Sequence, residues 1–189
     1  MKRRLFLGLE IDPDFQNIIF SAVAALKSKT TSFRWVQKEN LHLTIRFLGG
    51  IEESKIDKIR EVLAGPMASF TPFSIGFSEL GGFPNLKKCR VLWIGVEKGN
   101  EACLQLKKIS DDSLIRFGFP KEPENFIPHV TLARSKTNGE VFLDLLDRQI
   151  FTEMKKSQIL IKKMTLFQSE LKPSGALHTN LFDLHFKAA

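Results

Sequence analysis

The sequence lacks the long apolar runs that membrane-spanning helices need. No stretch approaches the roughly 20 apolar residues of a membrane span, so we expect no membrane partner. The N-terminus begins with basic residues and a short apolar run, which Glu10 and Asp12 interrupt. A secretory signal needs roughly 7–15 apolar residues before a small-residue cleavage site. We therefore interpret this segment as a first β-strand.

Cysteines are also scarce, and the sequence contains no convincing carboxylate-rich cluster. Cys89 and Cys103 have neither the spacing of metal ligands nor that of a disulfide framework. We therefore expect no metal and no cofactor, and a reducing cytoplasm is the simplest location. Low-complexity segments and obvious linkers are absent too. The chain of 189 residues fits a single domain over residues 1–189, built from two lobes, and we expect a monomer.

The charge is unbalanced toward the basic side. The sequence has 28 basic and 21 acidic residues, a formal net charge of +7. This balance is compatible with an anionic partner such as RNA, although many soluble proteins of similar charge bind no nucleic acid. The hydrophobic fraction of 43% is ordinary for a globular protein, which can bury a substantial core at this length.

Two short stretches share the pattern His-x-Thr-hydrophobic. They begin at His42 and His129, and each lies in an apolar run that alternates like a β-strand. A strand period of two places the histidine of each motif on the same face as its threonine, Thr44 or Thr131. A single motif of this kind is weak, but two of only 4 histidines falling in one repeated pattern predict a shared site.

The motifs occupy matching places in two similar halves of the chain. His129 lies 87 residues after His42, and Val91 lies 86 residues after Leu5. Strand and helix patterns follow in the same order in both halves, which indicates an internal duplication. An approximate two-fold axis between the halves would bring both motif strands to the centre. We expect strands over 5–11, 33–36, 41–48, 70–80, 90–97, 129–134, 159–171 and 181–186, and helices over 12–26, 52–64, 100–117 and 140–147.

These segments resemble the 2H phosphoesterases, most closely the RNA 2′,3′-cyclic phosphodiesterases once called 2′-5′ RNA ligases. The resemblance rests on RWV at 34–36, ENLHLTIRFLG at 39–49, LWIGV at 92–96, PHVTLAR at 128–134 and SELKPSG at 169–175. It implies an α+β, bilobal, duplicated fold in which two antiparallel sheets line a central cleft and helices cover the outside. One departure is His178, where many members carry tyrosine. We interpret His178 and His185 as structural or surface groups.

The resemblance implies hydrolysis of 2′,3′-cyclic phosphates at the ends of RNA or on nucleotides. Histidine can act as acid or base near neutral pH, so two histidines suffice without a metal. The resemblance assigns proton donation to the 3′ oxygen to His42 and proton acceptance to His129, which gives a 2′-phosphomonoester. The residues alone do not distinguish donor from acceptor. Thr44 and Thr131 would donate to the phosphate oxygens, whose charge grows in the transition state.

Two arginines are further candidates for binding the phosphate. Arg46 falls on the face of His42 and Thr44 if its strand is regular. Arg134 then points to the opposite face, although the family pattern His-x-Thr-x-x-Arg places an arginine at the phosphate. Trp35, Phe47 and Trp93 could stack on a base, but Trp93 fits a core position better.

Two alternatives remain open at this point. The same site could act on 2′-5′-linked oligonucleotides or perform 2′-5′ RNA ligation, which would require a partner with a 5′-hydroxyl. The cleft could also belong to a non-catalytic RNA-binding module, which would bind tightly and salt-dependently without forming a product.

Overall fold

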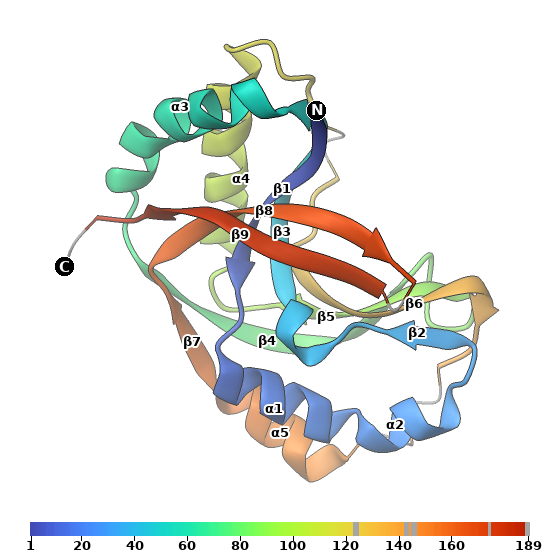
Figure 1. Ribbon diagram of the computed structural model, residues 1–189. Helices are drawn as coiled ribbons and strands as arrows, with labels where there is room; N and C mark the ends of the chain where they lie inside the picture. Colours follow the sequence, from blue (N-terminus) through green and yellow to red (C-terminus); the bar gives the residue numbers. More distant parts are fainter. Residues whose placement is uncertain (123–124, 142–143, 145–146, 174, 188–189) are drawn as a thin grey trace.

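The fold is a curled antiparallel sheet with helices packed on its two halves (Figure 1). The computed structural model describes residues 1–122, 125–141, 144, 147–173 and 175–187. The strands are β1 (Lys2–Glu10), β2 (Phe33–Trp35), β3 (His42–Glu52), β4 (Phe73–Phe83), β5 (Cys89–Val96), β6 (His129–Gly139), β7 (Gln158–Ile161), β8 (Lys163–Lys172) and β9 (Gly175–His185). The helices are α1 (Pro13–Ala22), α2 (Ala24–Lys29), η1 (Lys38–Asn40), η2 (Glu53–Lys55), α3 (Ile56–Ala68), α4 (Asn100–Ile115) and α5 (Arg148–Lys156).

The strand order places the two motif strands at the centre of the sheet. It runs β7-β4-β5-β6-β3-β1-β8-β9, and β2 pairs with β6 in addition. One half, β3-β1-β8-β9, is covered by α3 and α4, whereas α1 and α5 pack together beside β4 of the other half (Figure 1). The expected α+β fold with two antiparallel, duplicated halves is confirmed, and the pairing of β3 with β6 joins the halves.

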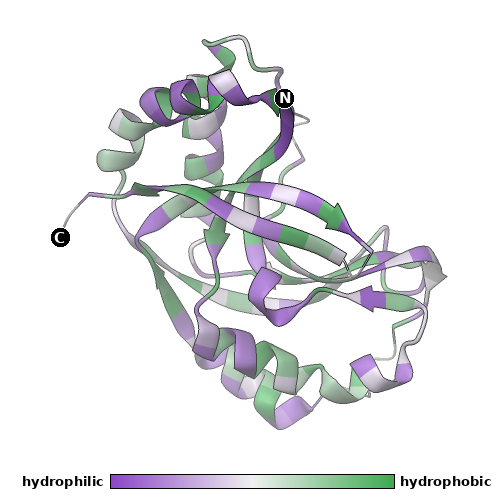
Figure 2. Cartoon of the chain, viewed as in Figure 1, coloured by the Kyte–Doolittle hydropathy of each residue, from purple (hydrophilic) through white to green (hydrophobic). Residues whose placement is uncertain are grey.

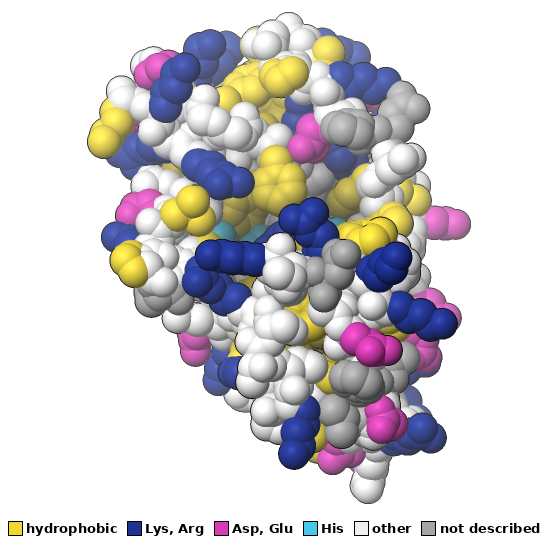
Figure 3. All heavy atoms as spheres, turned by 90° about the vertical axis from the view of Figure 1, so that its right-hand side faces the viewer, with side chains coloured by type: hydrophobic (Ala, Val, Ile, Leu, Met, Phe, Trp, Pro, Cys, Tyr) yellow, Lys and Arg dark blue, Asp and Glu magenta, His cyan; other side chains and the backbone are white. Residues whose placement is uncertain are grey.

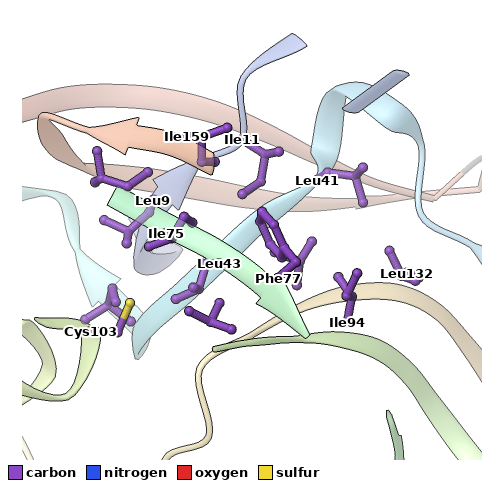
Figure 4. Packing of buried hydrophobic residues seen from close by; sticks show 14 of the residues in the cluster. Leu9, Ile11, Leu41, Leu43, Ile75, Phe77, Ile94, Cys103, Leu132 and Ile159 are labelled. Atoms are coloured by element: carbon purple, nitrogen blue, oxygen red, sulfur yellow. The ribbon is translucent and has the colours of Figure 1, made fainter. Parts of the chain in front are cut away.

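The core lies between the sheet and the helices. Apolar and polar residues alternate along helices and strands, so each element has one side to bury (Figure 2). Leu43, Ile94 and Leu132 point from the central strands toward Phe77 and Leu9 in one buried cluster (Figure 4). The motif strands therefore have one face fixed in the core, which leaves their other face for the site. None of the described helices combines the length and the apolar character needed to cross a membrane.

Several expected element boundaries were wrong. The helix expected to stop at Gly65 continues through Pro66 to Ala68, because Met67 in its last turn is completely buried. The strand expected over 159–171 is broken at Lys162 into two strands that pair with different partners. The strand expected to end at Leu80 continues as β4, which pairs with β5 as far as Phe83.

The helix expected over 140–147 is wrong at both ends, although Asp144 within it lies in a 3-10 turn. Residues 142–143 and 145–146 lie outside the described residues, and Glu140 and Val141 are not helical. A helix begins instead at Arg148, where the Asp147 carboxylate accepts hydrogen bonds from the backbone N–H groups of the first turn. Asp147 is thus an N-cap rather than a helix end.

Candidate active site

The two His-x-Thr motifs meet at one residue pair. Leu43 of β3 lies opposite Val130 of β6, and both side chains are completely buried. Continuing this antiparallel register places each histidine opposite the threonine of the other motif, on the face turned away from the core. His42 and His129 are then diagonal neighbours, a relation that corresponds to about 7–8 Å. A phosphate group can lie between two imidazoles at such a separation.

Backbone hydrogen bonds hold both imidazoles in the same way. His42 Nδ1 lies 2.7 Å from the carbonyl oxygen of Asn40, and His129 Nδ1 lies 2.6 Å from that of Ile127. In each case the carbonyl belongs to the residue two positions earlier, and it accepts the Nδ1 proton. Nε2 is therefore the nitrogen of each ring that is free to accept a proton.

The threonines of the two motifs differ in their contacts. The Thr44 hydroxyl lies 3.0 Å from His42 Nε2 and can donate to it when the ring is neutral. Thr131 lines the cavity described below, and no described residue forms a hydrogen bond with its hydroxyl. One hydroxyl is thus already aligned with a histidine Nε2, and the other is available to a ligand.

A cavity of about 730 Å³ lies over this face of the motif strands. It is lined by Arg4, Phe6, Arg34, Trp35, Val36, Gln37, Asn40, His42, Thr44, Phe47, Thr131, Arg134, Ser169, Leu171, Lys172, Gly175, Ala176 and His178. Figure 3 shows basic side chains gathered around a hollow with histidine at its base. The described lining contains no carboxylate, so the cavity suits an anion.

His129 lies beside this cavity rather than in its lining. Its ring packs against Phe83, with centroids 5.4 Å apart, and against Trp93 at 5.7 Å. Trp93 therefore supports His129 without lining the cavity. Its interpretation as a core residue was wrong, because Trp93 is half-buried, lies opposite Thr131 and is not part of the buried cluster. Trp35 and Phe47 do line it and are available for stacking on a base.

Both motif strands contain a β-bulge directly after the threonine. The bulge determines which of the following side chains line the cavity. The pairing of β1 with β3 skips Ile45, and the pairing of β5 with β6 skips Leu132. An extra residue shifts the alternation of the strand by one. Phe47 and Arg134, each five residues after the motif histidine, consequently line the cavity, whereas Arg46 does not.

The prediction that Arg46 shares the face of His42 was therefore wrong. Its side chain is only 1% exposed and points to the helix-covered side of the sheet. There it pairs with Asp111 of α4 and donates to the carbonyl of Pro120 at 2.7 Å. Lys107 joins this network by bonding Asp111 at 2.7 Å and Glu122 at 2.9 Å. Arg46 thus links β3 to α4 and the loop before β6.

Burial and neighbouring cations shape the acid–base properties of His42. Burial, with smaller contributions from His178, Arg134 and His129, lowers the pKa of His42 from 6.5 to about 4, whereas the hydrogen bond that His42 Nδ1 donates to the Asn40 carbonyl acts in the opposite direction. Burial also lowers the pKa of His129, with a smaller contribution from Arg134. Both rings are therefore neutral at pH 7 while the cavity holds no anion.

Sequence reasoning missed His178 as a site residue. It lies on β9, lines the cavity, and its ring centroid is 5.0 Å from that of His42 in a T-shaped arrangement. The interpretation of His178 as a structural or surface group was wrong. Arg4 and Arg34 were missed as well, although Arg34 lies directly before Trp35, in a segment that the family resemblance had already singled out. No group of three or more potential metal ligands is found among the described residues.

Comparison with known proteins adds a family match over most of the chain. The LigT-like phosphoesterase family matches twice, at residues 9–93 and 94–178. The duplication inferred from the motif spacing is therefore confirmed, with one match for each half. A protein of Methanothermobacter thermautotrophicus named RNA 2′,3′-cyclic phosphodiesterase is 30% identical over 96% of this chain and 97% of its own length. A protein of Methanocaldococcus jannaschii with the same name is 32% identical over 93% and 96%.

Solved structures share the fold over nearly the full length. A crystal structure from Thermus thermophilus has a TM-score of 0.81 at 22% identity and covers 97% of this chain and 98% of that one. The structure of Escherichia coli LigT in complex with 3′-AMP has a TM-score of 0.79 at 19% identity and covers 100% of both chains. These similarities establish the architecture around the cavity.

Proposed function

Because the chain belongs to the LigT-like phosphoesterase family, we propose that it hydrolyses 2′,3′-cyclic phosphates of RNA ends or nucleotides to 2′-phosphomonoesters. The observation that carries this proposal is the diagonal placement of His42 and His129 across the Leu43–Val130 pair. The names of relatives about 30% identical over almost the whole chain support the same substrate class.

In the proposed reaction, His129 Nε2 takes a proton from water as the water oxygen attacks phosphorus. The bond from phosphorus to the 3′ oxygen breaks, and His42, which has taken up a proton at Nε2 when the anionic substrate bound, supplies the proton that this oxygen needs. His129 gains one proton and His42 loses one. The transfer of one proton from His129 back to His42, directly or through solvent, restores the starting state. Each role typically contributes about 10²–10⁴-fold to the rate.

The remaining residues of the proposed site stabilise the phosphate. The hydroxyls of Thr44 and Thr131 and the guanidinium of Arg134 face the cavity, where they can donate to the non-bridging oxygens. The β-bulge at Leu132 brings Arg134 to this position. The proposal needs no metal ion, because the acid, the base and the electrostatic stabilisation all come from side chains.

The proposed enzyme acts as a monomer in the cytoplasm. Cys89 and Cys103 are buried, free thiols, which suit a reducing compartment.

The test uses 2′,3′-cyclic AMP with EDTA present and phosphorus NMR of the product. His42→Ala and His129→Ala should each lower kcat by about 10²–10⁴-fold while circular dichroism shows a folded protein. His185→Ala is the matched control, because His185 is exposed and lines neither of the two described cavities. A 2′-phosphate product is expected. Near-normal turnover in both cleft variants, or activity that EDTA abolishes, would refute the proposal.

A further inference from the structure

A second groove continues from the catalytic cavity along β2 and β6. It encloses about 430 Å³ and shares two lining residues, Arg34 and Arg134, with the first cavity. Its other lining residues are Thr31, Ser32, Phe33, Lys136 and Thr137. The described lining thus combines three cationic side chains with three hydroxyl groups and contains no carboxylate. These are the donor groups that phosphate oxygens accept from.

The cationic side chains of this groove lie close together, and no described acidic residue forms an ion pair with them. Arg34 lies directly opposite Arg134 in the antiparallel pair of β2 and β6, so both side chains leave the sheet on the same face. Like charges in that relation destabilise a sheet. Among the described residues, no ion pair involves Arg34, Arg134 or Lys136. An anionic ligand bound between Arg34 and Arg134 would offset the repulsion between their guanidinium groups.

The basic residues of the groove are spaced along β6, so they can contact successive phosphates of one chain. Lys136 follows Arg134 by two residues on the exposed face of the strand. At about 3.4 Å per residue, the two positions are about 7 Å apart, comparable with the distance between successive phosphates of an extended polynucleotide. Lys172, which also lines the first cavity, is already paired with Glu170 at 3.1 Å. The groove along β2 and β6 is therefore the better exit for a polyanion.

We propose that this groove binds the phosphodiester immediately upstream of the cyclic phosphate in a single-stranded RNA. Arg134 then lies between the two phosphates, and Lys136 contacts the upstream one. The inference rests on the proposed function, because that function places the 3′ end of the RNA between His42 and His129. It assigns the protein a preference for oligonucleotides over mononucleotides.

The experiment compares three substrates that differ only upstream of the reacting group. They are 2′,3′-cyclic AMP, the dinucleotide ApA ending in a 2′,3′-cyclic phosphate, and the same dinucleotide with an uncharged methylphosphonate linkage. For the wild type, kcat/KM should be highest for the charged dinucleotide. Lys136→Gln should lower kcat/KM on this substrate by about two- to fivefold, the effect of one exposed charge pair, and leave cyclic AMP unchanged. Lys156→Gln, on α5 and outside both cavities, is the matched control.

Salt dependence gives a second measurement of the same contact. The slope of log Kd against log salt concentration should differ by about 0.7 between wild type and Lys136→Gln for the charged dinucleotide product. Equal affinity of the wild type for the charged and uncharged dinucleotides would overturn the inference, as would an equal effect of Lys136→Gln on cyclic AMP. If the wild type hydrolyses none of the substrates, the proposed function is refuted instead. The affinities for the charged and the uncharged dinucleotide then still test whether the groove binds a phosphodiester.

Discussion

Replacing Arg46 by methionine should weaken the fold and leave catalysis nearly intact. The side chain is 1% exposed and its charge is balanced by Asp111. In Arg46→Met, Asp111 keeps its bond to Lys107 at 2.7 Å, so the remaining carboxylate is not stranded. The loss of the bond to the Pro120 carbonyl and of part of the partnership of Asp111 should cost about 1–3 kcal/mol in unfolding free energy.

Removing the other partner should cost more, because the buried charge then has no carboxylate. Asp111→Ala leaves the Arg46 guanidinium enclosed with only the Pro120 carbonyl as a described acceptor. Breaking a buried pair in this direction typically costs about 3–5 kcal/mol. Asp111→Ala should therefore lower the free energy of unfolding more than Arg46→Met does. This order is expected if the ion pair serves the stability of the fold.

Urea unfolding followed by tryptophan fluorescence measures both variants, and kcat on 2′,3′-cyclic AMP is measured below the transition. We expect kcat within a few-fold of the wild type for both. Loss of a donor to a transition-state oxyanion lowers kcat by about 10²–10³-fold. A drop of that size in Arg46→Met at unchanged stability would show that Arg46 contacts the phosphate and would refute the reasoning from the bulge.

Two further predictions concern the walls of the cleft. Because the pKa of His42 is about 4 in the folded protein and has its ordinary value of 6.5 in the unfolded chain, the unfolded chain binds more protons between these values. Unfolding free energy should therefore fall as pH drops from 6.5 to 4, by up to about 3 kcal/mol, and His42→Gln should lose this share in urea unfolding. A Cβ at Gly81 would lie 2.1 Å from the Trp93 ring, so Gly81→Ala should displace Trp93 from His129 and lower both stability and kcat. Gly65→Ala, whose Cβ meets nothing within 4 Å, is its control; equal kcat in the two would contradict the role of Trp93.

The sequence was sufficient to locate the site because its main signals are local and repeated. The motif offset of 87 residues agrees with two consecutive family matches of residues 9–93 and 94–178. Alternating burial along β3 and β6 follows directly from alternating hydrophobicity. The central position of both motif strands follows from the duplication, since equivalent strands meet at an approximate two-fold axis.

The sides of the sheet on which Arg46 and Arg134 lie could not be predicted from strand alternation, because the β-bulges interrupt that alternation. The duplication nevertheless held a usable signal. Aligned on their histidines, the motifs place Arg46 against Ala133 and Phe47 against Arg134. Ala133 is completely buried, so the first of these positions is a core position in both halves. The only part of this signal present in the sequence is that an apolar alanine stands at the position equivalent to Arg46, which favours an interior position.

Contacts between distant segments account for the residues that were missed. His178 reaches the cavity only because β9 folds back on β8, and the side-chain amide of Asn40 donates to the Ala176 carbonyl at 2.8 Å, which joins the two segments. The pairing of Arg34 with Arg134 similarly depends on β2 crossing to β6. Neither relation leaves a pattern within one stretch of sequence.

The two histidines have equivalent backbone positions but unequal surroundings, and this inequality provides a test of the proposed acid and base roles. His42 is enclosed by Phe6, at 4.7 Å between centroids, and by His178 at 5.0 Å. Burial, with a smaller contribution from Arg134, keeps it neutral in the empty cleft, so it can donate a proton only after a bound phosphate supplies a compensating negative charge. An NMR titration should therefore show the pKa of His42 rising on binding of 2′-AMP. If the pKa of His42 stays near 4 and that of His129 rises instead, His129 is the donor and the proposed roles are exchanged.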